Sequence, residues 1–264
     1  MSRRCRAKTI SDWHFRPVGR DGGAAVDGHW LEQTSHLVAD GRQVTFQSDR
    51  EGDLGLFRQR ADGTGPTERL TKSELGTPHE PDVWSPDGQT LLFEMIKDDR
   101  FSLWTLSLRD RKVDRFGIVE SRGRINGTFA PSGRWVAYGR REGSEYQVYV
   151  EPFPRTGDQH LVTTNEPASN PFWSPDGKEL FYASGRDSFH AVGFSTQPAV
   201  TFGNPVPVPR GRFREWYSGP RDYDLSPDGQ RILGVIVAPT TREALAPTIQ
   251  VVLDWSEELK AKVP

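Results

Sequence analysis

Polar residues of the kinds that bind ligands recur at a fixed distance before five glycines of this chain. They stand seven to nine residues before each glycine, except one histidine that stands five residues before it. These residues are Glu32, His36, His79, Glu80, Arg124, Asn126, Asn170, Arg221 and Asp222. Imidazole and carboxylate groups in such a set could hold a divalent cation, and Arg124 and Arg221 could clamp an anion. The alternative is that these groups line a wet channel and satisfy one another.

A second candidate site is the segment from Arg212 to Tyr217, where basic and aromatic side chains are interleaved. Its residues of interest are Arg212, Arg214, Trp216 and Tyr217. Arginines among aromatics can bind anions, sugars or bases. The alternative is that Trp216 and Tyr217 cover the edge of a sheet while the arginines lie in water. The histidines outside the first set are interpreted as ordinary loop or strand residues.

Signatures of nucleophilic or zinc-dependent hydrolysis are absent from the sequence. There is no Gly-x-Ser-x-Gly motif, so no nucleophile elbow is predicted. His79-Glu80 is followed by Pro81 and Asp82, which does not give the helical His-Glu-x-x-His spacing of a zinc site. A triad whose members meet only in space cannot be recognised from sequence.

The five glycines mark an internal repeat. Gly41, Gly88, Gly133, Gly177 and Gly229 follow one another at steps of 47, 45, 44 and 52 residues. Two of them end an identical Trp-Ser-Pro-Asp-Gly stretch, and a third ends Leu-Ser-Pro-Asp-Gly. Ser-Pro-Asp-Gly predicts a tight turn, because Pro fixes φ near −65°, Asp bonds back to its own backbone and Gly takes a positive φ.

Each turn is followed by runs with strand periodicity. Leu91–Met95 and Trp135–Tyr138 come directly after two of the turns, and Phe101–Leu106 and Tyr146–Val150 follow as second runs. Period-two alternation indicates half-buried strands. Four short antiparallel strands in every 40-odd residues are typical of a propeller blade. The predicted fold is an all-β propeller with five recognisable repeats and room for a degenerate sixth.

The domain prediction is a propeller over residues 31–264, preceded by a leader over residues 1–30. The leader does not fit the repeat and is Gly-rich and Ala-rich near Gly22. Two interpretations stay open for it. It is either a flexible tail or the source of an outer strand that closes the ring.

The pattern Pro-x-Trp-Ser-Pro-Asp-Gly-x-x-Leu-x-Phe, with Ser48–Gly52 after the first hairpin, resembles the TolB-type (WD40-like, PD40) propeller repeat over roughly residues 31–260. Val148–Pro154, Tyr223–Gly229 and Val251–Lys260 also look like the C-terminal propeller of bacterial serine/threonine protein kinases. No Gly-rich loop, His-Arg-Asp or Asp-Phe-Gly motif of a kinase is present. The resemblance therefore implies a non-catalytic binding or scaffolding module that does not phosphorylate.

Composition limits the partners and the compartment. The 264 residues carry a net charge of −2, which argues against a general nucleic-acid surface. Cys5 is the single cysteine, so no intrachain disulfide can form. No apolar run of signal-peptide or membrane-helix length occurs, so we expect no membrane association. As written the chain is expected to be cytoplasmic and soluble, or periplasmic if an upstream signal was lost.

Three functions stay open from sequence. The first is binding of a protein or small ligand at the blade-top loops without a resident cofactor, with self-association if the ring is incomplete. The second is a metal-assisted hydrolase or lyase that acts on a small ester, lactone or sugar at the channel mouth. The third is the gating propeller of a peptidase. A fold by itself does not choose among them.

Overall fold

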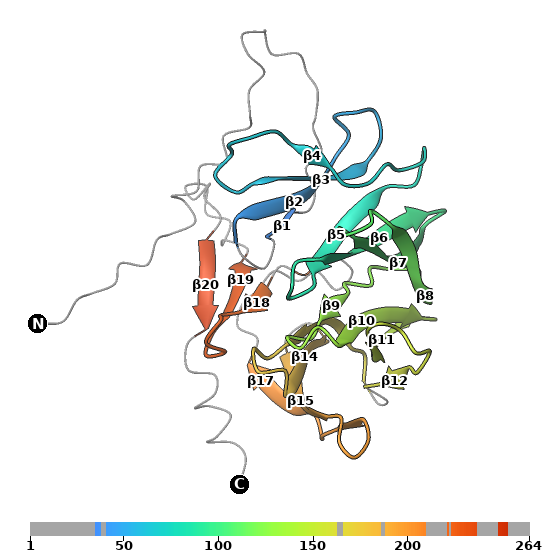
Figure 1. The fold of residues 1–264 in the computed structure, drawn as a ribbon. Helices are drawn as coiled ribbons and strands as arrows, with labels where there is room; N and C mark the ends of the chain where they lie inside the picture. The colour runs from blue at the N-terminus through green and yellow to red at the C-terminus, as the bar shows by residue number, and fades with distance from the viewer. Residues whose placement is uncertain are drawn as a thin grey trace, which may run out of the picture. The chain divides into compact units, whose positions relative to one another are not determined.

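The structure, a computed structural model, describes residues 35–37, 41–162, 166–185, 188–209, 221, 223–236 and 248–252. Every regular element in these residues is a β-strand (Figure 1). The same residues contain no helix of the length and apolarity needed to span a bilayer. The leader over residues 1–30 and the Arg212–Tyr217 segment lie outside the described residues.

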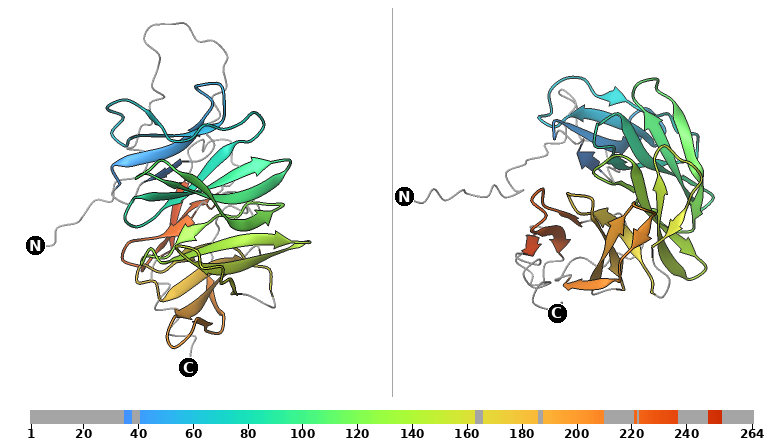
Figure 2. Two further views of the ribbon diagram at one scale, coloured as in Figure 1. Left: turned by 45° about the vertical axis from the view of Figure 1, so that its right-hand side comes forward. Right: turned by 60° about the horizontal axis from the view of Figure 1, so that its bottom comes forward.

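The strands form five antiparallel sheets that follow one another along the chain, which we number from one to five. Successive sheets lie side by side (Figure 2). The strands are, sheet by sheet, β1 Ser35–Leu37, β2 Gln43–Ser48, β3 Gly55–Arg60 and β4 Glu68–Arg69; β5 His79–Trp84, β6 Thr90–Lys97, β7 Arg100–Ser107 and β8 Val113–Ser121; β9 Thr128–Phe129, β10 Trp135–Glu142, β11 Glu145–Pro152 and β12 His160–Leu161; β13 Ser169–Trp173, β14 Glu179–Ser184, β15 Ser188–Ser195, β16 Thr201–Phe202 and β17 Val206–Pro209; β18 Tyr223–Leu225, β19 Ile232–Ile236 and β20 Thr248–Val252. In each sheet consecutive strands are hydrogen-bonded neighbours, except in sheet four, where β17 pairs with β15 and not with β16. Three of the five sheets have the four antiparallel strands that the repeat predicts, whereas sheet four has five strands and the described part of sheet five has three.

The repeated turn has the conformation predicted from its residues. Gly88 has φ 67°, and its N–H donates to the Ser85 carbonyl at 2.8 Å. The Ser85 hydroxyl donates to Asp87 at 2.5 Å and accepts the N–H of Thr90 at 2.9 Å, which closes the turn onto the next strand. All five repeat glycines have φ between 67° and 71°. Glycine adopts the left-handed region at less energetic cost than other residues, which explains why glycine ends each turn.

Large apolar side chains fill the space between successive sheets. Trp84, at the end of β5, packs with Leu56 of sheet one, and its indole N–H donates to Thr45 at 2.9 Å. Trp173, at the end of β13, packs in the same way with Val148 of sheet three. Burying one such side chain stabilises the fold by roughly 2–3 kcal/mol. The aromatic residue before the turn therefore packs between neighbouring sheets, as predicted.

Sheet four carries two short strands along β15. β16 pairs with the end of β15, Phe202 opposite Phe194. β17 pairs with its beginning, Val208 opposite Phe189. This accounts for the longer step between Gly177 and Gly229, because residues inserted after β15 return to pair with it.

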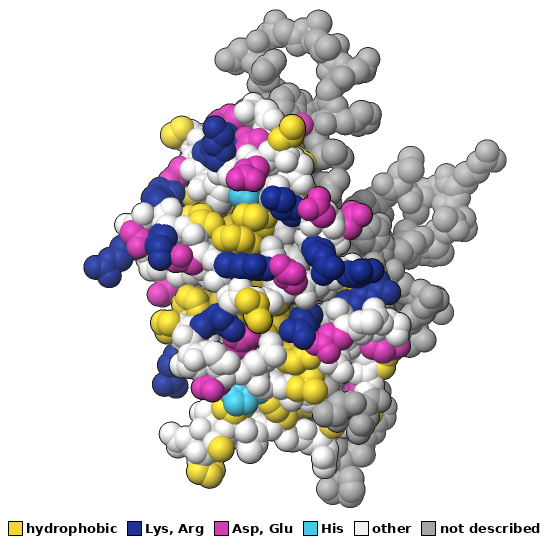
Figure 3. Space-filling model, turned by 90° about the vertical axis from the view of Figure 1, so that its right-hand side faces the viewer, with side chains coloured by type: hydrophobic (Ala, Val, Ile, Leu, Met, Phe, Trp, Pro, Cys, Tyr) yellow, Lys and Arg dark blue, Asp and Glu magenta, His cyan; other side chains and the backbone are white. Residues whose placement is uncertain are grey.

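The surface of the described residues mixes charges of both signs. On the face drawn in Figure 3, Lys and Arg side chains alternate with Asp and Glu, with apolar patches between them. Ile118 in β8 is 85% exposed on the outside of sheet two. Single exposed apolar residues of this kind are normal on soluble domains and need no special explanation.

Candidate functional site

Six of the polar residues that precede the repeat glycines are described with their side chains. They are His79, Glu80, Arg124, Asn126, Asn170 and Arg221. Glu32 and Asp222 lie outside the described residues, as do Arg212, Arg214, Trp216 and Tyr217. The backbone of His36 lies in β1. Five of the six come together at the beginnings of the inner strands, and His79 does not join them.

Two asparagines tie sheet three to sheet four. Asn126 and Asn170 both have a left-handed backbone, with φ 50° and 52°. The Asn126 side-chain amide donates to the Asn170 side-chain oxygen at 2.6 Å. The backbone N–H of Arg221 donates to the Asn126 side-chain oxygen at 3.3 Å, which brings the start of sheet five to the same place. Asparagine suits this position because it tolerates the left-handed region better than most residues.

Two arginines at this end have partners within the molecule. The Arg124 guanidinium forms an ion pair with Glu80 of sheet two, and both side chains are largely buried. Arg221 donates to the Pro171 carbonyl at 2.8 Å and lies 3.7 Å from Asp224. Both cations therefore hold neighbouring strands together.

Two buried carboxylates in this cluster were missed from sequence. Asp82 occupies a bulge in β5 and accepts the N–H of Gly127 at 3.0 Å. Glu94 in β6 accepts the N–H groups of Ile125 and Asn126 at 2.9 and 2.7 Å. Both carboxylates thus bond from sheet two to the backbone of sheet three.

The position of Glu94 had a sequence signal. Glu94 stands six residues after its turn glycine, and Gln47 stands at the same place in the preceding repeat. The Gln47 amide donates to the His79 carbonyl at 2.7 Å, so it also reaches the next sheet. A polar residue inside an apolar strand, at a repeated position, therefore marks a bond between sheets here.

Burial dominates the electrostatics of these carboxyl groups. It raises the pKa of Glu94 to about 7, with the nearby Glu80 acting in the same direction and Arg124 opposing it. Burial and the neighbouring Glu94 raise the pKa of Asp82 well above its usual range. One oxygen of Glu94 is buried without a hydrogen-bond partner among the described residues. In this buried site the carboxylates of Asp82 and Glu94 disfavour each other's ionisation.

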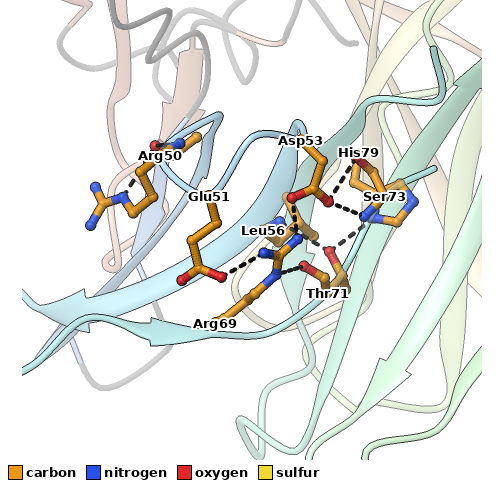
Figure 4. Close-up of polar contacts among 9 residues, drawn as sticks. Arg50, Glu51, Asp53, Leu56, Arg69, Thr71, Ser73 and His79 are labelled. Carbon is orange, nitrogen blue, oxygen red and sulfur yellow. Dashed lines mark hydrogen bonds and ion pairs between the residues drawn. The ribbon is translucent and has the colours of Figure 1, made fainter. Parts of the chain in front are cut away.

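His79 belongs to a different network, drawn in Figure 4. Its Nδ1 lies 2.8 Å from the Thr71 hydroxyl, which also accepts the N–H of Leu56 at 3.0 Å. The ring is 3% exposed and packs against Phe93. Burial lowers the pKa of His79 to about 4, so the imidazole is neutral at pH 7.

The start of β5 decides whether His79 and Glu80 can act together. The strand begins at His79, so the two side chains point to opposite faces. His79 faces Thr71, whereas Glu80 faces Arg124. The two residues therefore cannot both bind one ion. Among the described residues, no group of three or more His, Cys, Asp or Glu is placed to hold a metal.

Comparison with known proteins supports the fold and leaves most of each relative uncovered. No family model matches the chain. It is 29% identical over 119 residues to the Tol-Pal system protein TolB of Alcanivorax borkumensis, covering 44% of this chain and 25% of that protein. It is 29% identical over 163 residues to TolB of Anaeromyxobacter dehalogenans, covering 56% and 36%. It is 26% identical over 146 residues to the uncharacterized peptidase YuxL of Bacillus subtilis, covering 55% and 20%. The chain thus spans about a fifth to a third of these relatives.

Solved structures give the fold directly. The crystal structure of TolB from Acinetobacter baumannii matches with a TM-score of 0.66 at 16% identity, over 85% of this chain and 52% of that one. The fold is that of a TolB-like β-propeller. A putative TolB from Agrobacterium tumefaciens matches with a TM-score of 0.54 at 19% identity, over 75% of this chain and 73% of that one.

The Ser48–Gly52 motif has a structural role in this TolB-like propeller. The Arg50 guanidinium lies 4.8 Å from the ring centre of Phe46, and its Nε donates to Ser48 at 3.2 Å. Glu51 pairs with Arg69 of β4 at 2.6 Å (Figure 4). The motif therefore fastens the first hairpin to the outer strand of its own sheet.

Proposed function

We propose that this chain is a non-catalytic propeller module that binds a protein partner at the beginnings of its inner strands. One observation carries the proposal. Residues from sheets three, four and five meet there through Asn126, Asn170 and Arg221, which fixes one composite face. The curated TolB relatives are named as proteins of the Tol-Pal system, and this supports a protein as the partner.

The arginines of the same region are held in place before any partner binds. Arg124 and Arg221 are occupied by Glu80 and by the Pro171 carbonyl, and their exposed fractions are 14% and 13%. Groups held in this way lose little conformational freedom when a partner docks, so binding carries a smaller entropic cost. Pre-organised faces of this kind change little on binding.

A photo-crosslinking residue at Arg122 tests the proposal. Arg122 is exposed and lies two residues before Arg124, at the proposed face. Arg134 is also exposed but lies in the turn after β9, at the other end of the strand, and makes a matched control. We expect illumination in the source cells to give a discrete protein adduct from position 122 and none from position 134. Equal adducts from both positions, or none from either, would contradict the proposal.

A second candidate is that the chain is the propeller of a larger enzyme. The similarity to the uncharacterized peptidase YuxL favours a peptidase. An immunoblot of source cells distinguishes a propeller that is part of a larger enzyme from a free module. A band near the 29.7 kDa of this sequence supports the free module, and a much larger band supports the enzyme. Fractionating the same cells would distinguish a cytoplasmic from a periplasmic protein.

A further inference from the structure

A groove of about 950 Å³ lies between the outer edges of sheets three and four, away from the inner strands. One wall is Gln159–Val162, which contains β12, and the other is Val200–Pro205, which contains β16. Glu166 and His190 complete the lining. The volume is at the upper end of the range for ligand sites.

Both walls present backbone groups of an edge strand. Among the described strands, β12 pairs with β11 and β16 with β15, each on one side only. Val162 donates to the Val148 carbonyl at 2.9 Å, so the alternation of an antiparallel ladder turns the N–H and C=O of Leu161 away from the sheet. Gly203 donates to the Gly193 carbonyl at 2.9 Å. By the same alternation the backbone N–H and C=O of Phe202 point away from β15. Edge backbone of this kind pairs with extended chain.

Glu166 supplies a fixed negative charge to the groove. Its carboxylate accepts bonds from the Tyr182 hydroxyl at 2.7 Å, the Ser184 hydroxyl at 2.8 Å and His190 Nδ1 at 2.6 Å. Burial acts to raise the pKa of Glu166, but these three hydrogen bonds outweigh it and lower the pKa. The side chain is 27% exposed. The ionised carboxylate is therefore held in place and reachable from the groove.

The charge balance of the lining selects the sign of a ligand. Among the described residues that line the groove there is no Lys or Arg, and Glu166 is the one carboxylate. His190 keeps Nδ1 on Glu166, which orients its ring and leaves Nε2 as its remaining polar atom. An anionic ligand would be repelled by this arrangement, whereas a guanidinium or ammonium group would be attracted.

We propose that this groove binds an extended peptide segment of a protein partner, with a basic side chain seated on Glu166. The edge backbone of Leu161 and Phe202 pairs with the peptide main chain, and Glu166 selects the anchor residue. This surface is separate from the face at the inner strands. Its partner is defined by chemistry alone: an extended strand that carries arginine or lysine.

Fluorescence anisotropy with a labelled pentapeptide of sequence Thr-Val-Arg-Val-Thr tests the proposal on the full chain. A second peptide carries citrulline, which has nearly the shape of arginine but no charge. A third carries arginine with N-methyl groups at alternate backbone nitrogens. We expect the arginine peptide to bind about tenfold more tightly than the citrulline peptide, the gain usual for a hydrogen bond to a charged group. Methylation at alternate nitrogens blocks the N–H groups along one edge of the extended peptide, so this peptide can pair with one wall only and should bind more weakly than the arginine peptide.

Three variants locate the effect. Glu166→Gln should bind both unmethylated peptides equally, whereas Glu145→Gln removes an exposed charge outside the groove and should keep the tenfold preference. Tyr182→Phe removes, from a fully buried position, one of the three donors that hold Glu166, and should reduce the preference without abolishing it. Equal binding of arginine and citrulline peptides to the parent, unchanged preference in Glu166→Gln, or no binding of any peptide to the parent would overturn the proposal. The parent comparison decides the question even if Glu166→Gln does not fold.

Discussion

Asn126 and Asn170 stand 44 residues apart, occupy the same position of successive repeats and bond to each other side chain to side chain at 2.6 Å. Both have a left-handed backbone, with φ 50° and 52°. A repeated residue therefore serves twice, once to permit the backbone turn and once to join neighbouring sheets. In repeat proteins such interfaces between units contribute much of the stability.

The first prediction removes this bond in two ways. Asn126→Gly keeps a residue that accepts φ 50° but loses the amide, and Asn126→Ala loses the amide and strains the backbone. We expect both variants to be destabilised, with Ala less stable than Gly by about 1 kcal/mol. Urea unfolding measures the difference. Asn204→Ala, at an exposed position, is the control and should change stability by less than about 0.5 kcal/mol. If Ala proved as stable as Gly, the left-handed backbone would not matter at this position.

The second prediction concerns the repeated turn. Gly88→Val places a β-branched residue at φ 67° and should cost roughly 1–3 kcal/mol. Gly177→Val, at φ 71°, should behave alike. Gly193→Val is the matched control, because Gly193 has an ordinary φ and a Cβ there would meet no atom within 4 Å. Thermal unfolding of the three variants measures the effect. Equal melting temperatures for Gly88→Val and Gly193→Val would contradict the assigned turn.

The elements that sequence predicted are those fixed by local chemistry. Ser85, Pro86 and Gly88 specify their turn among themselves, and the alternation in Leu91–Met95 specifies the strand that follows. The packing of Trp84 between sheets was also predictable, because each repeat carries a large apolar residue directly before its turn. At these positions the conformation that the residues favour locally is also the one that the whole fold requires.

The roles of the polar residues were not predictable, because they depend on distances between repeats. A one-residue bulge at Asp82 turns its carboxylate toward Gly127. No local sequence pattern predicts that bulge. His79 was grouped with Glu80 by its distance from Gly88, but the strand already begins at His79 and separates the two side chains. Their assignment as ligand-binding residues stays a prediction.

The third prediction follows the protonation of His79. Its pKa is lowered from 6.5 to about 4 in the folded protein, so the unfolded chain binds a proton more readily. Stability should therefore be complete above pH 6.5 and be lost as pH falls toward 4, by on the order of 1–3 kcal/mol. Titration of the ring by NMR checks the cause. A His79 ring that titrates near 6.5 would show that the imidazole is not desolvated.

The last prediction concerns Glu94, whose pH dependence has the opposite sign. Its pKa is raised from 4.5 to about 7, so the folded state keeps a proton that the unfolded chain releases. Its contribution is favourable below pH 4.5 and is lost progressively as pH rises from there to 7. Glu94→Gln removes the titration, and its amide oxygen can still accept the N–H groups of Ile125 and Asn126. Relative to the parent, this variant should gain on the order of 1–3 kcal/mol between pH 4.5 and 7.5.

The difference between variant and parent is the quantity to measure, because His79 and Glu94 titrate over overlapping ranges with opposite effects on the parent. Subtracting the unfolding free energies at each pH cancels the His79 contribution, since that residue is present in both proteins. Glu145→Gln, which removes an exposed carboxylate outside this cluster, is the matched control. A difference for Glu94→Gln that does not vary with pH would mean that the Glu94 carboxyl is already ionised in the folded protein. The ion pair of Arg124 with Glu80 would then have to extend to Glu94, and Arg124→Gln should destabilise the parent more than the Glu94→Gln variant.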